Sequence, residues 1–472
     1  MLSLGNCKGK ANRRPHIVLV VSDDQGWNDV SWHNPEVLTP NMDKLAKRGV
    51  RLENHYVHPQ CTPSRGAILT GKYSHRLGLQ FAAILPNEAK FLPASATLLP
   101  EKLKELGYVT HMTGKWHLGD CNKNLLPTSR GFDSFTGLLR GAEDYFTRRT
   151  FGVYDFWENG TVYTPQEGSY NTDLFTQRAV EIIGKNNPKT SPLFLYMPYT
   201  TPHFPLQVPK RFIDMYPNVK NPARRAYLGM VSSLDEGVGT IADALEKSGH
   251  MDNTVFIFLS DNGGDPNFGG SNLPLRGNKG SLWDGGSKSL GFIYSPRFLK
   301  HRGCLHKGMM HAVDWFPTIL DIAGFNKDKK RNKFCHIDGV SQWKYLQRCR
   351  GSGRNEFVYQ IDDYVAKSAA IRVGDYKMIV GDPRVAAFSF FPNGTILIKP
   401  IDPNSTDIRL FNLKNDPTES NNLASRFPNK VKKMMIRLDE LRKDSLPTEL
   451  PVLEANEIGS PNNIVSTEWC SV

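Results

Sequence analysis

The chain has 472 residues, 39% of them hydrophobic and 22% charged, and a formal net charge of +12. This composition excludes a fibrous or largely disordered protein, and the length allows about two domains, one with a large core. No apolar stretch approaches the roughly 20 residues of a membrane-spanning helix. The sequence also lacks the basic stripe, interleaved with aromatic residues, that would predict nucleic-acid binding. The positive charge suits an anionic polymer, but it serves solubility equally well.

Residues 1–14 are polar and basic, and we predict a disordered lead-in there. This segment lacks the apolar core of a signal peptide. Three glycosylation sequons, at Asn159, Asn393 and Asn404, nevertheless indicate a secretory route. We therefore expect a lysosomal or secreted protein whose true start lies upstream of this sequence.

Four short apolar runs, rich in β-branched residues, alternate with helical stretches in the first part of the chain. The runs cover residues 16–21, 108–112, 192–197 and 254–259. Two intervening helices are expected over residues 41–49 and 96–107, the second ending at Gly107. Continuous apolar strands separated by helices predict an α/β fold with a large, mostly parallel sheet covered by helices on both faces.

Polar residues follow each of these runs. Asp23 and Asp24 follow the first, residues 114–117 the second, residues 200–203 the third, and residues 261–264 the fourth. Open α/β sheets bind their ligands at the carboxyl ends of parallel strands. The four segments are therefore predicted to meet in one site.

Two pairs of oxygen-bearing side chains in these segments are candidate metal ligands. They are Asp23 with Asp24, and Asp261 with Asn262. A single Asp would more often be a turn or cap residue, but two pairs, each just past a strand, favour a metal site. A set of oxygen ligands without histidine or thiolate suits Ca²⁺ or Mg²⁺ and disfavours zinc.

A further segment, residues 61–71, opens with Cys61 and contains Pro63 and Arg65 at fixed offsets before it ends at Gly71. Proline suits the first turn of a helix, where its missing N–H is not needed. Cys61 is therefore expected at a helix N-terminus, beside free backbone donors that attract anions. A lone cysteine at such a place would more often be an ordinary buried residue.

The last hundred residues have a different pattern. Strands are expected on both sides of a turn at Gly374, over residues 369–379, and further strands of an antiparallel sheet at residues 388–391 and 394–399. A helix is expected near residues 427–443, with its apolar stripe facing the core. We thus predict a catalytic domain over residues 15–365 and a smaller α+β domain over residues 366–472.

Apart from Cys61, six cysteines remain, and six allow 15 pairings. The best guess joins Cys335 to Cys349, which flank a short polar stretch.

Taken together, these motifs resemble the type I sulfatases of the alkaline phosphatase superfamily, and the nearest match is the arylsulfatase B (N-acetylgalactosamine-4-sulfatase) group. The resemblance extends over nearly the whole chain from Arg14, and its motifs are residues 20–30, 61–71, 107–117, 127–133, 205–209, 282–286, 314–320 and 410–419. Two departures are Thr113 and the pair Ser287-Lys288, which place substrate contacts in doubt more than catalysis.

The resemblance implies that a formylglycine-generating enzyme oxidises Cys61, whose hydrated aldehyde then attacks sulfur in a covalent, two-step reaction. One Ca²⁺ would be bound by Asp23, Asp24, Asp261 and Asn262, with the residue at position 61. Arg65 would support the nucleophile, and Lys115 and Lys279 would hold sulfate oxygens. His203 would protonate the leaving sugar oxygen, and His117 would remove a proton so that sulfate departs.

The expected substrate is a sulfated sugar, such as N-acetylgalactosamine 4-sulfate in glycosaminoglycans, contacted by loops such as residues 141–145. Two alternatives stay open. One is a phosphate or phosphonate monoester hydrolase on the same fold, although such relatives use a serine or threonine nucleophile and a histidine-rich two-zinc site. The other is an inactive relative that binds sulfated glycans.

Overall fold

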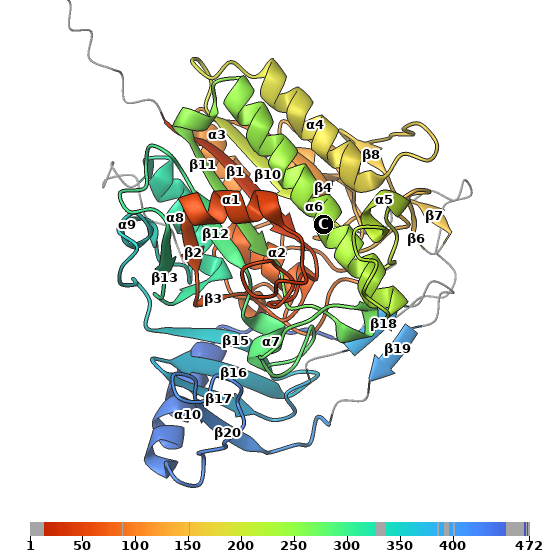
Figure 1. Cartoon of the computed structure of the whole chain (residues 1–472). Helices are drawn as coiled ribbons and strands as arrows, with labels where there is room; N and C mark the ends of the chain where they lie inside the picture. The colour runs from red at the N-terminus through yellow and green to blue at the C-terminus, as the bar shows by residue number, and fades with distance from the viewer. Residues whose placement is uncertain are drawn as a thin grey trace, which may run out of the picture.

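A computed structural model describes residues 14–470 except residues 87, 151, 326–336, 385–386, 391–395, 400–401, 450–466 and 469. The predicted lead-in therefore lies almost wholly outside the described residues. Figure 1 shows a large sheet flanked by helices, with a smaller sheet below it. The large sheet has the order β13-β2-β12-β11-β1-β10-β4-β5-β8-β9.

The predicted parallel strands form the centre of this sheet. β11, β1, β10, β4 and β5 are mutually parallel, and antiparallel strands join on both sides. The bounds are β1 His16–Ser22, β2 Val50–Leu52, β4 Val109–Lys115, β5 Ser134–Leu138, β8 Trp157–Glu158, β9 Thr161–Val162, β10 Leu193–Pro198, β11 Thr254–Ser260, β12 Gly291–Tyr294 and β13 Cys304–His306. The α/β class and the mostly parallel sheet are confirmed.

Both faces of the sheet are buried, which explains the unbroken apolar runs. In β1, Ile17, Leu19 and Val21 pack on one face with residues of α2, α3 and α8. Val18 and Val20 point to the other face, which is covered by α1, α4 and α6. The helix bounds are α1 Pro40–Arg48, α2 Cys61–Thr70, α3 Leu99–Glu105, α4 Asn171–Lys185, α5 Lys210–Ile213, α6 Pro222–Lys247, α7 Asp284–Ser287, α8 Trp315–Ile322 and α9 Trp343–Leu346.

The helix predicted over residues 96–107 is shorter than expected, because α3 begins only at Leu99. Pro100 occupies its first turn, and the carboxylate of Glu101 accepts a hydrogen bond from the backbone N–H of Leu98 at 2.9 Å. Proline disfavours a helical conformation in the residues before it, so the helix starts there.

A four-stranded antiparallel sheet, β15-β16-β17-β20, forms the lower part of the molecule in Figure 1. Its strands are β15 Glu356–Asp362, β16 Ser368–Val373, β17 Tyr376–Val380 and β20 Ile408–Asn412. Helix α10 (Pro428–Arg442) buries Met434 and Leu438 against the core, as its stripe predicted. The first of these strands starts ahead of residue 365, and the domain boundary there stays a prediction.

The strands expected at residues 388–391 and 394–399 do not extend this sheet. β18 (Ala387–Phe390) and β19 (Ile396–Lys399) pair with each other as a separate two-stranded ribbon. Two short strand pairs complete the description: β3 (His55–Tyr56) pairs with β14 (Met310–His311), and β6 (Arg149–Thr150) with β7 (Val153–Tyr154).

The predicted pairing of Cys335 with Cys349 is wrong, because Cys349 forms a disulfide with Cys304. A second disulfide joins Cys121 to Cys470 across 349 positions of the sequence. Cys335 lies outside the described residues. In both disulfides the two cysteines are distant in sequence and become neighbours only in the folded chain.

Of the three sequons, Asn159 and Asn404 are exposed, and Asn393 lies outside the described residues. Within the part of the chain that the structure describes, no helix is both long and apolar enough to cross a membrane.

Candidate active site

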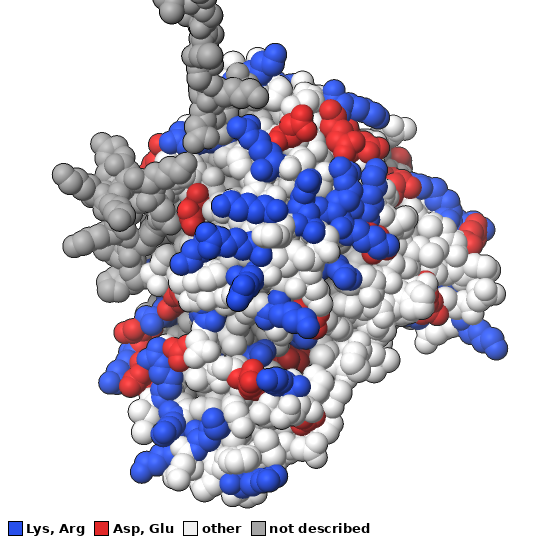
Figure 2. Space-filling view, turned by 60° about the vertical axis from the view of Figure 1, so that its left-hand side comes forward, with Lys and Arg blue, Asp and Glu red and all other residues white. Residues whose placement is uncertain are grey.

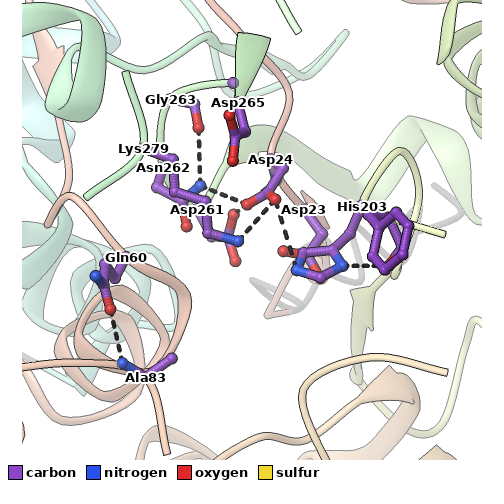
Figure 3. Close-up of polar contacts among 12 residues, drawn as sticks. Asp23, Asp24, Gln60, Ala83, His203, Asp261, Asn262, Gly263, Asp265 and Lys279 are labelled. Atoms are coloured by element: carbon purple, nitrogen blue, oxygen red, sulfur yellow. Dashed lines mark hydrogen bonds and ion pairs between the residues drawn. The ribbon is translucent and has the colours of Figure 1, made fainter. Parts of the chain in front are cut away.

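The two predicted pairs of oxygen ligands lie side by side at the carboxyl ends of β1 and β11. These strands pair in parallel up to Ser22 and Ser260, so the residues that follow them leave the sheet together. The backbone N–H of Asp24 donates to Asp261 Oδ1 at 3.2 Å, and Asn262 Nδ2 donates to Asp24 Oδ1 at 2.7 Å. Figure 3 shows these side chains pointing toward one another. The predicted juxtaposition is present.

Two oxygen acceptors in this group have no hydrogen-bond partner although they are buried. They are Asp23 Oδ1 and Asn262 Oδ1. A buried acceptor without a partner is costly, since it has lost its water and gained nothing in exchange. Hard divalent cations are bound by such carboxylate and amide oxygens. The donor set therefore fits a Ca²⁺ or Mg²⁺ ion.

Three basic residues balance the three carboxylates; Arg65 and Lys115 are buried, and Lys279 is partly exposed. Lys115 Nζ lies 2.6 Å from Asp23 Oδ2, Lys279 Nζ lies 2.7 Å from Asp24 Oδ2, and Arg65 lies 2.8 Å from Asp261 Oδ2. The cluster is thus neutral without a cation. A divalent cation would make it positive, as the binding of an anionic substrate requires.

The pKa values of the carboxyls reflect their neighbours. Burial opposes ionisation of Asp24, but Lys279 and His203 outweigh it and lower the pKa to about 2. Burial and the nearby charge of Asp23 raise the pKa of Asp261 to about 6. Asp24 is therefore ionised over a wide pH range.

Helix α2 places Cys61 at its first position, as predicted, and ends with Gly71 in a left-handed conformation, φ 72°. The thiol is 1% exposed, and burial raises its pKa to about 12. As a thiol it is therefore a poor nucleophile. Its sulfur and one ligand atom each of Asp23, Asp24 and His203 all lie within 4.8 Å of one another.

His203 faces this cluster from the loop that follows β10. Its Nε2 lies 3.5 Å from Asp24 Oδ2, and its Nδ1 lies 2.6 Å from the carbonyl oxygen of Phe204. A carbonyl oxygen can only accept, so Nδ1 carries the proton and the free electron pair of Nε2 points into the site. Burial and Lys279 lower the pKa of His203 to about 3.

His117 has the reverse arrangement. Its Nε2 lies 2.8 Å from the carbonyl oxygen of Ile84, so that nitrogen donates, and its buried Nδ1 has no partner. Burial and Lys115 lower its pKa well below the usual value. A Cβ on Gly141 would lie 2.5 Å from the ring, so only glycine fits beside it. Each of the two histidines thus has one ring nitrogen held by a backbone carbonyl oxygen.

Two of these residues have left-handed backbones, which non-glycine residues rarely adopt. They are Asp24, with φ 60°, and His117, with φ 53°. Such conformations cluster at functional sites, because the surrounding structure must enforce them. For Asp24, the hydroxyl of Tyr227 donates to the backbone carbonyl at 2.9 Å, and Asp29 accepts from the backbone N–H of Gly26 at 3.2 Å.

Sequence reasoning missed these supports, and also Tyr145, whose hydroxyl lies 2.8 Å from the carbonyl oxygens of Thr200 and His203. No local motif marks them. Tyr145 belongs to the loop expected to face the sugar, but its buried hydroxyl holds the histidine loop instead. Of the two departures, Lys288 lies over the Trp27 ring at 4.4 Å, whereas Thr113 Oγ1 is buried without a partner.

The sulfatase family model matches residues 15–325. Arylsulfatase J from Mus musculus is 40% identical over 468 residues, covering 93% of this chain and 77% of that protein. N-acetylgalactosamine-6-sulfatase from Mus musculus is 31% identical over 398 residues, covering 79% of this chain and 74% of that protein.

Among solved structures, Ps i-CgsB matches with a TM-score of 0.79 and 30% identity, covering 92% of this chain and 94% of that chain. That protein is also known in complex with k-i-k-neocarrahexaose.

Proposed function

The chain belongs to the sulfatase family and is a sulfuric ester hydrolase, and on that premise we propose that it removes sulfate from sulfated sugars. The observation that supports this proposal is the buried cluster in which Cys61, at the start of α2, lies close to Asp23 and Asp24, and in which Asp23 Oδ1 and Asn262 Oδ1 have no hydrogen-bond partner. We propose formylglycine at position 61, which supplies a hydrated aldehyde as the nucleophile.

We propose that Asp23, Asp24, Asp261 and Asn262 hold one Ca²⁺ together with the side chain at position 61. When bound, the ion withdraws charge from the sulfate group and orients it. Lys115 and Lys279 already lie beside Asp23 and Asp24, so each ammonium is in reach of sulfate oxygens held there. Arg65 fixes Asp261 through two nitrogens, at 2.8 and 3.1 Å, and thereby positions the ligand set.

The two histidines divide the proton transfers. His203 gives a proton from Nε2 to the leaving sugar oxygen, because that nitrogen faces the site while Nδ1 is held by the Phe204 carbonyl. The anionic ester bound beside it favours the protonated ring. His117 accepts a proton at its unpartnered Nδ1, so that the second hydroxyl at position 61 can return to a carbonyl as sulfate leaves.

For the substrate we propose N-acetylgalactosamine 4-sulfate of glycosaminoglycans. The likeness of the motifs to the arylsulfatase B group supports it, and the relatives named N-acetylgalactosamine-6-sulfatase support a sulfated amino sugar. We also propose a lysosomal or secreted location, with glycans on Asn159 and Asn404. The two disulfides fit an oxidising compartment.

The first test compares turnover of p-nitrophenyl sulfate and p-nitrophenyl phosphate by the purified protein. Faster sulfate turnover, lost on chelation and restored by Ca²⁺, is expected. Faster phosphate turnover would support the phosphatase alternative, and no turnover of either would support the inactive relative.

Two further measurements complete the test. Mass analysis of the peptide that contains position 61 reports the oxidation, and active material with an unmodified thiol would contradict the mechanism. A panel of 4-sulfated and 6-sulfated galactosamine and sulfated glucosamine oligosaccharides then decides the substrate. Preference for the 6-sulfate would contradict our specific assignment.

A further inference from the structure

Three segments far apart in the sequence form one basic surface, which we call the basic face. They are residues 44–51, 297–307 and 344–350, and they contain eleven Lys and Arg residues and no Asp or Glu. In Figure 2, Lys and Arg side chains, drawn blue, outnumber the red Asp and Glu side chains around the centre of the view. Sequence reasoning found no such clustering, because the three segments lie far apart along the chain.

Direct contacts join the three segments. β13 pairs with β2, with Leu305 opposite Arg51. The backbone N–H of Lys300 donates to the carbonyl of Gln347 at 3.0 Å, and Gln347 Nε2 donates to the carbonyl of Phe298 at 3.1 Å. The Cys304–Cys349 disulfide adds a covalent link. The basic face is therefore built on a fixed frame.

Most of its charges have no acidic partner. Lys300, Arg302, Lys307, Arg348 and Arg350 are exposed, and none of them lies within 4.0 Å of a carboxylate among the described residues. Lys47 is the exception, with Asp43 at 2.9 Å. At one border, near Tyr294, Glu246 and Asp252 limit the positive area.

Local roles account for only part of this charge. Lys47 and Arg48 lie in the last turn of α1, where cations favour the helix dipole. β13 is the edge strand of the large sheet, and charged side chains such as Lys307 prevent pairing with another molecule. Neither reason applies to Lys300, Arg302, Arg348 and Arg350, which lie outside helices and strands.

We propose that the basic face is a docking surface for a linear sulfated polysaccharide, which it binds outside the catalytic pocket. This inference rests on the proposed function for the chemistry of the ligand. A row of fixed, exposed cations binds a linear polyanion by releasing its counterions, without any shaped pocket. The sulfate groups of the same polymer are then both the substrate and the anchor.

The position of the basic face relative to the site supports this. β2 and β13 run parallel to β1 and β11, since β12 is antiparallel to both of its neighbours. Lys307, just past β13, therefore lies at the edge where the catalytic residues lie. Three strand spacings separate β2 from β1, about 14 Å. Lys300 and Arg302 precede β13 and therefore lie toward the opposite edge of the sheet. The basic face thus runs along β13 to Lys307, where a bound polymer reaches the edge that carries the site.

The test uses full-length protein carrying Cys61→Ala, so that no sulfate is removed, and a heparin dodecasaccharide as the probe. Binding is measured between 0.05 and 0.5 M NaCl, on the order of the range over which counterion release is measured. We compare the triple variant Lys300→Ala, Arg302→Ala, Arg348→Ala with a matched control, Lys185→Ala, Lys189→Ala, Lys220→Ala. The control removes the same charge from exposed lysines outside the three segments.

We expect the triple variant to raise Kd about tenfold and to reduce the slope of log K against log salt by about two to three, as expected for three lost ionic contacts. The control should leave Kd within about twofold, since it removes the same net charge from outside the contact. Equal losses in both variants would overturn the proposal, because net charge alone would then explain binding.

Two arms keep this result separate from the proposed function. In protein with Cys61 intact, the triple variant should hydrolyse p-nitrophenyl sulfate at the normal rate and lose rate only on polymeric substrate. Equal loss on the small ester would overturn the docking role. Duplex DNA of equal length should bind more weakly than heparin, and equal affinity would overturn the assignment to sulfated glycan. Failure to hydrolyse any sulfate ester, with heparin binding intact, would contradict the proposed function alone.

Discussion

Two buried clusters in this molecule both combine acidic and basic side chains. They differ in whether their buried oxygen acceptors have partners within the protein. In the cluster at the carboxyl ends of β1 and β11, Asp23 Oδ1 and Asn262 Oδ1 have no hydrogen-bond partner. The second cluster, which we call the joining cluster, consists of Asp284, Glu419, Lys377, Tyr56 and Tyr359. It connects the body of the large sheet to the four-stranded sheet.

In the joining cluster both oxygens of Asp284 are occupied. Oδ1 accepts from Tyr359 at 2.8 Å and from Lys377 at 2.8 Å, and Oδ2 accepts from Tyr56 at 3.1 Å. Glu419 lies 2.7 Å from Lys377 with one oxygen and accepts from the backbone N–H of Asp284 with the other, also at 2.7 Å.

The difference separates a structural cluster from a binding cluster. Where every carboxylate oxygen has a hydrogen bond or, as for Glu419 Oε1, an ion pair within the protein, the charges fix two parts of the chain together. Where acceptors are left over, a ligand must fill them. Burial alone does not distinguish the two cases, because both clusters are almost completely buried.

The largest expected effect is on activity. Cys61→Ala removes the proposed nucleophile and should lower kcat on p-nitrophenyl sulfate by about 10⁴-fold or more. The melting temperature should change little, since the thiol is neutral and small. A variant that keeps a tenth of the activity would contradict the role of the pocket as the reactive cluster.

The second effect is on stability. Lys377→Met leaves Asp284 and Glu419 buried without their cation, which should lower the free energy of unfolding by about 3–5 kcal/mol. Lys432→Met, at an exposed position of α10, is the matched control and should cost about 0.5 kcal/mol or less. Urea denaturation measures both, and equal costs would contradict the structural role of the joining cluster.

The third prediction concerns Ca²⁺ binding to the acceptors that have no partner. Ca²⁺ at about a hundred times its Kd should stabilise the protein by about 2.7 kcal/mol, because it binds the folded chain only. Asn262→Ala removes one of the unpartnered oxygens and should weaken this stabilisation. Thermal unfolding with and without chelator measures this stabilisation. The same melting temperature with chelator as without it would argue against a metal.

The smallest prediction concerns buried groups that carry neither partner nor charge. Burial lowers the pKa of His75 to about 3, and both of its ring nitrogens lack partners. An unfolded histidine has a pKa of about 6.5. Between these two pKa values the unfolded chain binds a proton at this histidine and the folded chain does not. The free energy of unfolding is therefore unaffected by this histidine above about pH 6.5 and falls as the pH drops toward 3.

The expected slope is up to about 1.4 kcal/mol per pH unit for this one histidine. His75→Phe should flatten the pH dependence of unfolding by about that amount, whereas substitution of the exposed His301 by Gln should not. An unchanged slope in His75→Phe would show that this ring is protonated in the folded protein.

The sequence was sufficient for the centre of the fold and for the proximity of the candidate ligands at its edge. Strands buried on both faces must be apolar throughout, as in residues 16–21 and 254–259, so they can be recognised without their neighbours. The carboxyl ends of such strands share an edge, which brings Asp23, Asp24, Asp261 and Asn262 together. The start of α3 was predicted three residues too early, at residue 96, although Pro100 carries the signal for a start at Leu99.

Features made by contacts between distant segments could not be predicted. Cys335 is nearer to Cys349 in the sequence than Cys304 is, yet folding brings Cys304 beside Cys349. Likewise, the joining cluster uses Tyr56, Asp284 and Lys377, which share no motif. The basic face is likewise divided among three segments, so charge counted along the chain did not reveal it.

The Cys121–Cys470 bond has a consequence for the order of biosynthesis. Its second cysteine leaves the ribosome roughly 400 residues after position 61, about 20–80 s later at common rates of translation. Until then, the loop that carries His117 lacks its covalent tether to the end of the chain. The maturing enzyme proposed above thus has its opportunity early, while the nascent thiol is still accessible and before later parts of the chain close over it.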